Sequence, residues 1–380
     1  MPDEAVQKGL EGVTAEETRL SWIDGERGEL VIGGFPLEEI AQDASFEEIV
    51  FLLYEDRLPT REELDEFRAD IRTYRSLSEP TREVVTAAGE GGQSAMDTLR
   101  MGIASASFSQ CGDVSDEEMA ILAVAQLPTI VATYWRARNG ADPIEPRSDL
   151  DFAENYLYML TGEVPADAET RGLETYLNAV VDHGFNASTF TARTIVSTES
   201  DVVSGVTGGI GALKGPLHGG APGPVLDMIE AAHEADDVET LLREKLDAGE
   251  RLMGFGHRVY RVRDPRAAVL SKAAEQFYRD ENEGHRAFFE TARETENTAK
   301  ELLEEYQPDR SLSTNVEFYT AVLLNGIGIP RDLFTATFAV ARTGGWTAHC
   351  LEQLSDNRII RPRAKYMGER DRTWVPLTER

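Results

Sequence analysis

The sequence predicts an all-α protein, because helix signals recur along the chain and strand signals are few. Ser45 and Glu48 have the spacing of a capping box ahead of an apolar helix face, and Thr60 and Glu63 repeat the pattern. The uncharged run 119–135 contains a glutamine and a proline, so it indicates a buried helix rather than a membrane span. Neither strand–helix alternation, a heptad seam nor an internal repeat competes with this interpretation.

The other elements follow from local signals. Extended backbone is expected only over 29–33, which is rich in β-formers, and at Trp374 and Val375. Asp149 is expected to cap a helix that runs to Leu160. These short extended pieces are too few to form the core of a domain.

A glycine-rich segment divides the chain. Residues 204–224 hold eight glycines and three prolines, too many for one regular helix, so we expect a turn-rich crossing between two domains there. Residues 231–311 are mostly acidic and helical. We therefore expect a small helical domain, 219–323, inserted into a large helical domain formed by residues 1–218 and 324–380.

The charge balance limits the possible partners. The 380 residues carry 68 acidic and 38 basic side chains, a formal charge of −30, and only six of the basic residues are lysines. Phosphate contacts would have to overcome this repulsion, which disfavours general nucleic-acid binding. An acidic, lysine-poor surface suggests a protein kept soluble at high salt, although an ordinary acidic cytoplasmic enzyme has a similar composition.

Targeting and metal signals are weak. The segment 1–13 has early acids and no apolar core, so it lacks the pattern of a signal peptide and a cytoplasmic location is expected. Cys111 and Cys350 are too few for a disulfide framework and cannot form a CxxC site. No HExxH, Walker, GxGxxG or GxSxG pattern occurs. We expect no metal and no bound cofactor.

Three of the six histidines are candidates for chemistry. His183, His218 and His257 each have a glycine within one or two residues. Glycine lets the backbone approach a ligand and places an imidazole on a turn. For each histidine alone, a hydrogen-bonded structural role is the alternative.

Arginines are concentrated in two places. Segment 251–266 has five arginines and one acid, Asp264, and segment 358–372 has five arginines and Lys365 against two acids. Guanidinium groups bind carboxylates and phosphates in a bidentate manner, so these segments favour an anionic ligand. Surface ion-pair networks are the alternative.

Glu317 lies between apolar residues, where burial would raise its pKa toward that of a general base. The alternative is a partly exposed helix acid. Together with the histidines and arginines, it suits proton abstraction beside a carbonyl and attack of the enolate on a carboxylate-rich partner.

Five motifs stand out in the sequence: GPLHGG (215–220), GFGHRVYRVRDPRA (254–267), NVEFYTAVLL (315–324), FAVARTGGW (338–346) and NRIIRPRAKYMGE (357–369). They resemble motifs of the citrate synthase family, in the family's order and spacing, and the similarity runs from about residue 10 to 370. The resemblance implies a helical homodimer whose subunits each have a large and a small domain. It also implies a Claisen-type condensation of acetyl-CoA with oxaloacetate, followed by thioester hydrolysis.

The resemblance implies three catalytic residues. His218 matches the histidine that stabilises the enol of acetyl-CoA, and His257 matches the one that polarises and protonates the oxaloacetate ketone. Glu317 occupies the position of the catalytic base, which is usually aspartate in this family. One additional methylene moves the carboxylate by about 1 Å, a displacement that can cost on the order of a hundredfold in rate.

The resemblance also implies the binding residues. His183, Arg266 and Arg342 match ligands of the oxaloacetate carboxylates, and Arg361 matches an arginine that reaches the neighbouring subunit's site. Four residues match the CoA groove or a CoA-phosphate contact: Gly254, Gly256, Arg261 and Asn315.

A second departure is Pro222, which replaces the family's usual asparagine and removes an amide near the CoA entrance. Two alternative functions stay open: 2-methylcitrate synthesis from propionyl-CoA, and CoA or dicarboxylate binding without catalysis because of Glu317. An acidic scaffold without a small-molecule ligand would leave the histidines and arginines unexplained.

Overall fold

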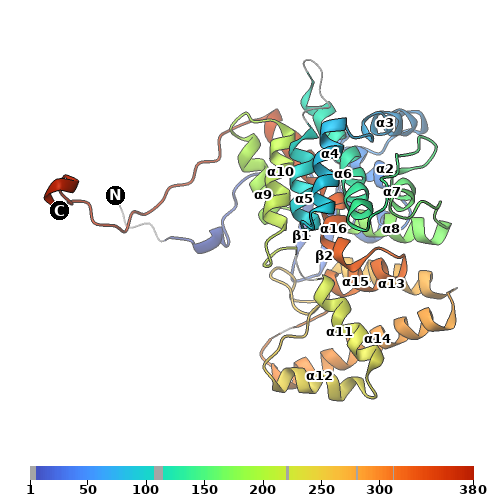
Figure 1. The fold of residues 1–380 in the computed structure, drawn as a ribbon. Coiled ribbons are helices and arrows are strands. Elements are labelled where there is room, and N and C mark those ends of the chain that lie inside the picture. Colours follow the sequence, from blue (N-terminus) through green and yellow to red (C-terminus); the bar gives the residue numbers. More distant parts are fainter. Residues whose placement is uncertain (1–5, 107–113, 220–221, 280, 311) are drawn as a thin grey trace.

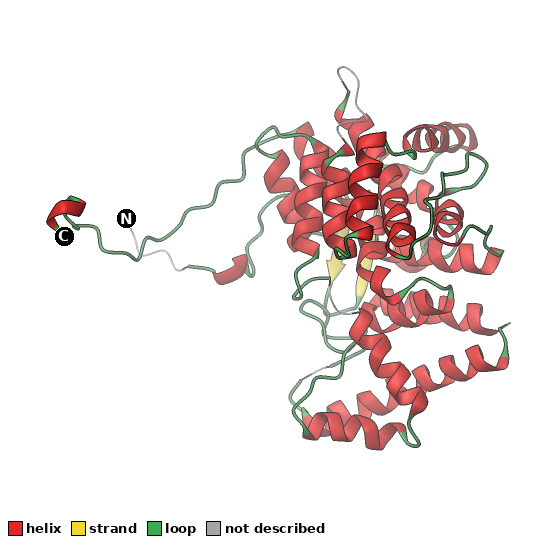
Figure 2. Ribbon diagram, viewed as in Figure 1, coloured by secondary structure: helices red, strands yellow, loops and turns green. Residues whose placement is uncertain are grey.

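The computed structural model describes residues 6–106, 114–219, 222–279, 281–310 and 312–380. Helices make up most of it, which confirms the all-α prediction (Figure 2). The strands of the described residues form one antiparallel sheet, β1 (Ser21–Asp24), β2 (Glu29–Ile32) and β3 (Phe35–Pro36), in the order β1-β2-β3. The predicted extended segment at 29–33 is therefore confirmed.

The helices of the described chain follow one another with short connections. In chain order they are α1 (Leu37–Ile40), α2 (Phe46–Glu55), α3 (Arg61–Tyr74), α4 (Glu79–Glu90), α5 (Ala95–Ala104), α6 (Asp116–Arg138), α7 (Phe152–Thr161), α8 (Asp167–Val180), α9 (Ala187–Val196), α10 (Val202–Leu213), α11 (Pro222–Glu234), α12 (Val238–Asp247), α13 (Pro265–Arg279), α14 (Glu283–Tyr306), α15 (Val316–Gly326) and α16 (Phe334–Ser355), with short 3-10 helices η1 (Lys8–Leu10), η3 (Arg331–Leu333) and η4 (Leu377–Glu379).

Local capping predictions hold at two helix starts and fail at a third. The capping boxes of Ser45 and Thr60 begin α2 and α3. Helix α7, however, begins at Phe152 with Asp151 as its N-cap, not at Asp149. Asp149 instead accepts a hydrogen bond from Arg147 Nε at 2.9 Å. Two aspartates two positions apart offer similar local signals, and the capping box of Asp151 with Glu154 fixes the helix start.

Helices α6 and α16 form the centre of the larger group of helices (Figure 1). Helix α6 packs against α4, α5 and α16, and α16 also packs against α2, α8, α9 and α10. In the described residues, α6 is the helix long and apolar enough to cross a membrane, but 78% of that apolar window is buried inside the protein. The prediction of a buried helix over 119–135 is confirmed.

Helices α11 to α15 form the lower group in Figure 1. Helix α14 packs against α11, α12 and α13, and α15 packs against α11 and α13. Helices α13 and α15 also pack on α8, so the two groups meet along these helices. The domain boundaries expected at 219 and 323 stay a prediction.

The glycine-rich segment 204–224 is not one regular helix, as predicted, but most of it is helical, so the prediction of a turn-rich segment is wrong for its first half. Helix α10 extends to Leu213, and turns are confined in the described residues to 214–219. A Cβ atom on Gly208 would lie 2.2 Å from Ile195 Cδ1, and one on Gly209 would lie 3.0 Å from the Trp346 ring. These glycines therefore permit close helix packing. Residues 220–221 lie outside the described part of the chain.

The C-terminal segment after α16 leaves the body of the protein in an extended path (Figure 1). Residues 361–380 are exposed and contain no strand, so the strand expected at Trp374 and Val375 is wrong. A strand needs a neighbouring backbone to pair with, and this segment runs away from the sheet. Cys350 is free and buried in α16, while Cys111 lies outside the described residues.

Candidate active site

The candidate site lies where α8, α13, α15 and α16 meet. Arg266 lies in the first turn of α13 and Glu317 in the first turn of α15, Arg342 lies within α16, and His183 follows α8. Residues separated by up to 159 positions in the sequence are therefore brought to one junction. The following contacts determine what each side chain can do.

His257 is held as a neutral hydrogen-bond donor. Its Nδ1 accepts hydrogen bonds from the backbone N–H groups of Val259 (3.0 Å) and Tyr260 (3.2 Å). Because Nδ1 accepts, the proton of the neutral imidazole resides on Nε2. Burial and the charge of Arg266 lower the pKa of His257 to about 4. At neutral pH the ring therefore offers an N–H group to a ligand.

The Arg266 guanidinium lies beside this donor. Its Nη2, which can only donate, is 3.3 Å from His257 Nε2, so with the proton on Nε2 two donors face each other at this point. Its Nε and Nη2 also donate to the two Asp264 oxygens at 3.0 and 2.8 Å. Burial disfavours the charged form of Arg266, but Asp264 outweighs this effect and its pKa is raised. Two adjacent donors, one of them charged, suit a carbonyl or carboxylate oxygen.

His183 forms the next part of the site. Its ring centroid lies 5.6 Å from that of His257, nearly perpendicular to it, and its Nε2 is 3.1 Å from the Tyr260 hydroxyl. Burial together with the charges of Arg266 and Arg342 holds the pKa of His183 well below its ordinary value. His183 is therefore neutral in a positively charged pocket.

Arg342 has an unused donor. It is 1% exposed, and its Nε donates to the Val180 carbonyl at 2.7 Å. Its Nη2 is buried and has no hydrogen-bond partner among the described residues. Burial lowers the pKa of Arg342 to about 10, so it is charged at neutral pH. A buried charged N–H group without a partner indicates a site that an anion fills.

Glu317 has the environment of a general base. It lies in the first turn of α15, where its backbone N–H donates to the N-cap Asn315 Oδ1 at 3.0 Å. Its Oε2 is shielded from solvent and unpartnered within the described part of the chain. Burial raises the pKa of Glu317 to about 7, against the lowering effect of Arg266. The residue as a whole is half-buried, as the alternative of a partly exposed helix acid expects, but its shielded Oε2 and raised pKa distinguish it from an ordinary one.

His218 is positioned by α9. The backbone N–H of Ser188 donates to His218 Nε2 at 3.3 Å, and the Ser188 hydroxyl lies 2.8 Å from the same nitrogen. Trp346 Nε1 in turn donates to that hydroxyl at 3.1 Å. With Nε2 as the acceptor, the ring proton resides on Nδ1. Burial and the charge of Arg342 lower the pKa of His218 to about 4.

The predicted CoA residues Gly254, Gly256 and Asn315 form a structural unit. Asn315 donates through its backbone N–H to the Gly254 carbonyl and through Nδ2 to the Gly256 carbonyl, both at 2.9 Å. Both glycines have positive φ, and a Cβ on Gly254 would lie 2.9 Å from Phe318. This unit presents the first turn of α15. Its contact with CoA stays a prediction.

Two predicted residues lie apart from this junction. Arg261 is exposed on the loop before α13, where its backbone N–H donates to the Gly25 carbonyl at 2.8 Å. Arg361 lies on the exposed C-terminal segment and does not reach the junction within its own chain. Of the five arginines in 251–266, Arg266 is the one that the structure buries in the site.

Sequence reasoning missed several neighbours of the predicted residues. Tyr260 lies inside the HRVY motif, and Asp182 precedes His183, so proximity in sequence could have identified both. Tyr176 had no such signal, yet its buried hydroxyl has no partner in the described structure, and the charge of Glu317 acts on it. The described residues contain no cluster of three potential metal ligands.

Comparisons with known proteins agree with this geometry. A family model described as "Citrate synthase, C-terminal domain" matches residues 9–363. The similar proteins include citrate synthase of Haloferax volcanii (42% identity, 99% of each chain) and 2-methylcitrate synthase 2 of Corynebacterium glutamicum (36% identity, 99% of this chain and 98% of the other). Among solved structures, citrate synthase of Pyrobaculum aerophilum matches with a TM-score of 0.88 at 34% identity, over 100% of this chain and 96% of the other. Citrate synthase of Thermoplasma acidophilum, in a ternary complex with carboxymethyl-coenzyme A and oxaloacetate, matches with a TM-score of 0.90 at 30% identity, over 99% of this chain and 100% of the other.

Proposed function

The chain belongs to the citrate synthase family of acyltransferases, and we propose that it condenses acetyl-CoA with oxaloacetate and hydrolyses the product thioester to citrate and CoA. The observation that carries this proposal is the convergence of charged and neutral donors around a carboxylate with a buried oxygen. The donors are Arg266, Arg342 and His257, and the carboxylate is Glu317.

The arginines and His183 bind oxaloacetate. Arg342 offers the unpartnered Nη2, and Arg266 offers a guanidinium already oriented by Asp264, so each can hold one carboxylate. The Nε2–H group of His257 then lies beside the ketone oxygen, where it polarises the carbonyl and donates a proton as the alkoxide forms. Its low pKa supports this role, because a neutral imidazole retains the required proton without adding a positive charge.

Glu317 and His218 form the nucleophile. Glu317 removes a proton from the acetyl methyl group, and the Nδ1–H group of His218 donates to the thioester oxygen of the resulting enolate. The enolate carbon attacks the ketone carbon and forms the new C–C bond. Water then cleaves the thioester and releases CoA as a thiol.

Glu317 determines whether this chemistry is efficient. The additional methylene relative to aspartate displaces the carboxylate by about 1 Å, which can reduce the rate on the order of a hundredfold unless the site compensates. A pKa near 7 favours a working base. The alternative of a binding protein without catalysis therefore depends on this residue.

The acyl group is the second open choice. Acetyl and propionyl differ by one methylene, which a pocket discriminates by about 1–3 kcal/mol. Relatives of both kinds, citrate and 2-methylcitrate synthases, are similar to this chain. We favour acetyl-CoA because the more similar Haloferax protein is named citrate synthase.

The test is thiol release from each acyl-CoA in the presence of oxaloacetate, at low and at molar salt. We expect release with acetyl-CoA, faster than with propionyl-CoA, and its loss in His257→Ala with CoA binding retained. Faster release with propionyl-CoA would favour 2-methylcitrate synthesis. Tight binding of the substrates without thiol release, together with thiol release in the Glu317→Asp variant, would identify a binding protein.

The remaining expectations are part of the same proposal. The enzyme acts as a homodimer in the cytoplasm, at high salt, without a metal or a cofactor. Its small domain, 219–323, closes on the large one over the substrates. Arg361 binds substrate in the neighbouring subunit's site, a role supported by its place on the extended C-terminal segment. Gly254, Gly256, Arg261 and Asn315 bind CoA.

A further inference from the structure

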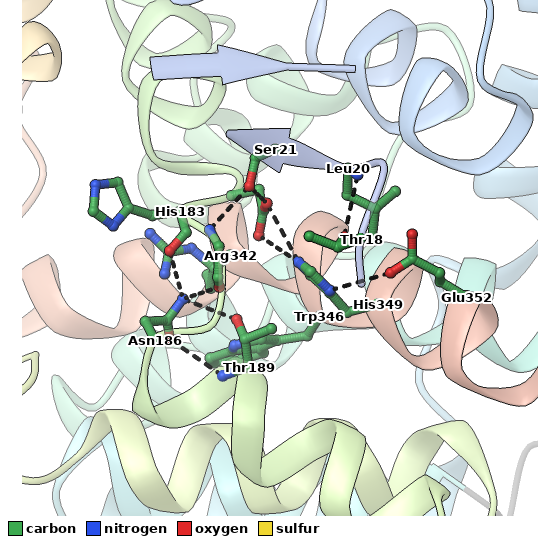
Figure 3. Close-up of polar contacts among 12 residues, drawn as sticks. Thr18, Leu20, Ser21, His183, Asn186, Thr189, Arg342, Trp346, His349 and Glu352 are labelled. Atoms are coloured by element: carbon green, nitrogen blue, oxygen red, sulfur yellow. Dashed lines mark hydrogen bonds and ion pairs between the residues drawn. The ribbon is translucent and has the colours of Figure 1, made fainter. Parts of the chain in front are cut away.

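A row of buried polar side chains leads away from the substrate-binding residues, behind His183 (Figure 3). It joins Ser21 on β1 to Asp182 in the loop after α8, and continues through His349 of α16 to Arg193 of α9 and Glu352. Asp182 and His349 are both fully buried. None of the steps of the proposed reaction uses them.

The hydrogen-bond pattern fixes the charge of His349. Arg193 Nη1 lies 3.1 Å from His349 Nδ1, and a guanidinium can only donate, so Nδ1 accepts. The ring proton is therefore on Nε2, which donates to Asp182 Oδ2 at 3.4 Å and lies 3.2 Å from Asp182 Oδ1. Arg193 also pairs with Glu352. His349 is thus a neutral connector between charged groups.

The same network holds the loop that carries His183. Ser21 Oγ donates to Asp182 Oδ2 at 2.5 Å and accepts from the backbone N–H of Gly184 at 3.0 Å. On the opposite side, a Cβ on Gly345 would lie 2.8 Å from Asp182 Oδ1, so α16 packs directly against the loop. His183 lies in sequence between Asp182 and Gly184, which these contacts hold in place.

The negative charge of Asp182 also stabilises the charged form of Arg342. Arg342 bonds the backbone of the same loop through the Val180 carbonyl, and Asp182 is the acid that most favours its charged form. Asp182 Oδ2 takes the hydrogen bonds of both Ser21 and His349, and Asp182 Oδ1 has no hydrogen-bond partner among the described residues. The Arg342 Nη2 atom is also without a hydrogen-bond partner within the described residues. Asp264, in contrast, bonds Arg266 directly.

We propose that Asp182 and His349 are positioning residues, which hold His183 and Arg342 in the arrangement that binds the oxaloacetate carboxylates. This inference rests on the proposed function. It requires that damage to the network weakens oxaloacetate binding specifically, because the residues assigned to CoA lie on other elements, the loops before α13 and α15.

Substitutions at His349 separate its two hydrogen bonds. His349→Gln places an amide N–H near the position of Nε2 and keeps the donor to Asp182, whereas His349→Asn reaches only the position of Nδ1. We expect His349→Asn to raise the KM for oxaloacetate about tenfold, the loss of about one charge-assisted hydrogen bond. His349→Gln should stay within about threefold of the wild type. The KM for acetyl-CoA should change little in either variant.

Ser21→Ala tests the other side of Asp182 without altering the helical core. We expect the KM for oxaloacetate to rise about fivefold in this variant, since one hydrogen bond to a carboxylate is lost. His233→Asn is the matched control, because His233 is exposed and bonds Thr291 instead. Circular dichroism and thermal unfolding check that each variant is folded.

A folded His349→Asn or Ser21→Ala variant with the wild-type KM for oxaloacetate would overturn the inference. An equal rise of the KM for oxaloacetate and of the KM for acetyl-CoA would also overturn it. If His349→Asn does not fold, Ser21→Ala decides. If the wild type releases no thiol, the proposed function fails instead. Calorimetric oxaloacetate binding to the same variants then decides the positioning role separately, and unchanged affinity would reject it.

Discussion

Glutamine at position 317 should stabilise the ligand-free protein at neutral pH while it removes the proposed base. Burial raises the pKa of Glu317 from its ordinary 4.5 to about 7, so folding favours the protonated carboxyl. The stability due to the bound proton is fully present below pH 4.5 and is lost as the pH rises through 7. Glutamine resembles the protonated form at every pH and does not undergo this loss.

The magnitude follows from the size of the shift. The difference between 7 and 4.5 is 2.5 pKa units, and at 1.36 kcal/mol per unit it corresponds to about 3.4 kcal/mol. The free energy of unfolding of Glu317→Gln relative to the wild type should therefore rise by up to about 3 kcal/mol between pH 4.5 and pH 8. For 380 residues, this is about 4 °C in Tm.

Thermal unfolding at pH 5 and pH 8, at one fixed high salt concentration and without substrates, measures this difference. Glu296→Gln is a control of opposite sign. Although burial opposes it, hydrogen bonds from Lys300, Thr314 and Tyr319 lower the pKa of Glu296, so its charged form stabilises the fold. That stability is present above the ordinary pKa and is lost as the pH falls through the lowered one. Glu296→Gln should therefore be less stable than the wild type at pH 8.

The result that would refute the reasoning is a gap between Glu317→Gln and the wild type that stays constant or shrinks as the pH rises. Such a result would mean that the Glu317 carboxylate is solvated or paired in the ligand-free protein. Its proposed readiness as a base would then have no physical support. Thiol release by the same variant gives the independent check, and we expect none above background.

Two further predictions concern buried groups near the site. Tyr176→Phe should leave the free energy of unfolding unchanged or raise it by up to about 1 kcal/mol, because the Tyr176 hydroxyl is buried without a partner in the described residues. Tyr156→Phe should lower the free energy of unfolding by about 1 kcal/mol, because the Tyr156 hydroxyl forms a hydrogen bond with Thr337 at 2.9 Å. Denaturant unfolding measures both variants. A greater loss of unfolding free energy in Tyr176→Phe than in Tyr156→Phe would show that the Tyr176 hydroxyl has a partner. Gly345→Ala should destabilise the fold by more than about 2 kcal/mol and raise the oxaloacetate KM, because its Cβ would lie 2.3 Å from the Val181 carbonyl. A variant with wild-type stability and KM would show that the loop yields freely.

Local sequence signals predicted the elements that depend on local contacts. The capping boxes at Ser45 and Thr60 are closed within four residues, so their meaning does not depend on the rest of the fold. The glycines of 204–213 were misinterpreted as turn formers. Glycine equally permits close packing, and only the positions of Ile195 and Trp346 show which property is used.

The candidate site was predictable as a set of residues but not as an arrangement. Neighbouring glycines single out His183 and His257, a motif contains Arg266, and the structure brings the three together. By composition, both arginine-rich segments were equally good candidates for an anion-binding site. In the structure, Arg266 is buried beside Asp264, whereas Arg361 lies on the exposed C-terminal segment. Charge density in sequence does not determine burial.

The sequence by itself determined the helical class, the family and the residue types available for chemistry, because local periodicity, caps and motif spacing depend on neighbours along the chain. Only the tertiary structure decided which groups are deprived of partners. The burial of Glu317, the free donor of Arg342 and the network through Asp182 and His349 all depend on helices distant in sequence. Desolvation and hydrogen-bond geometry are properties of the packed junction, and they set the protonation states on which the proposed reaction depends.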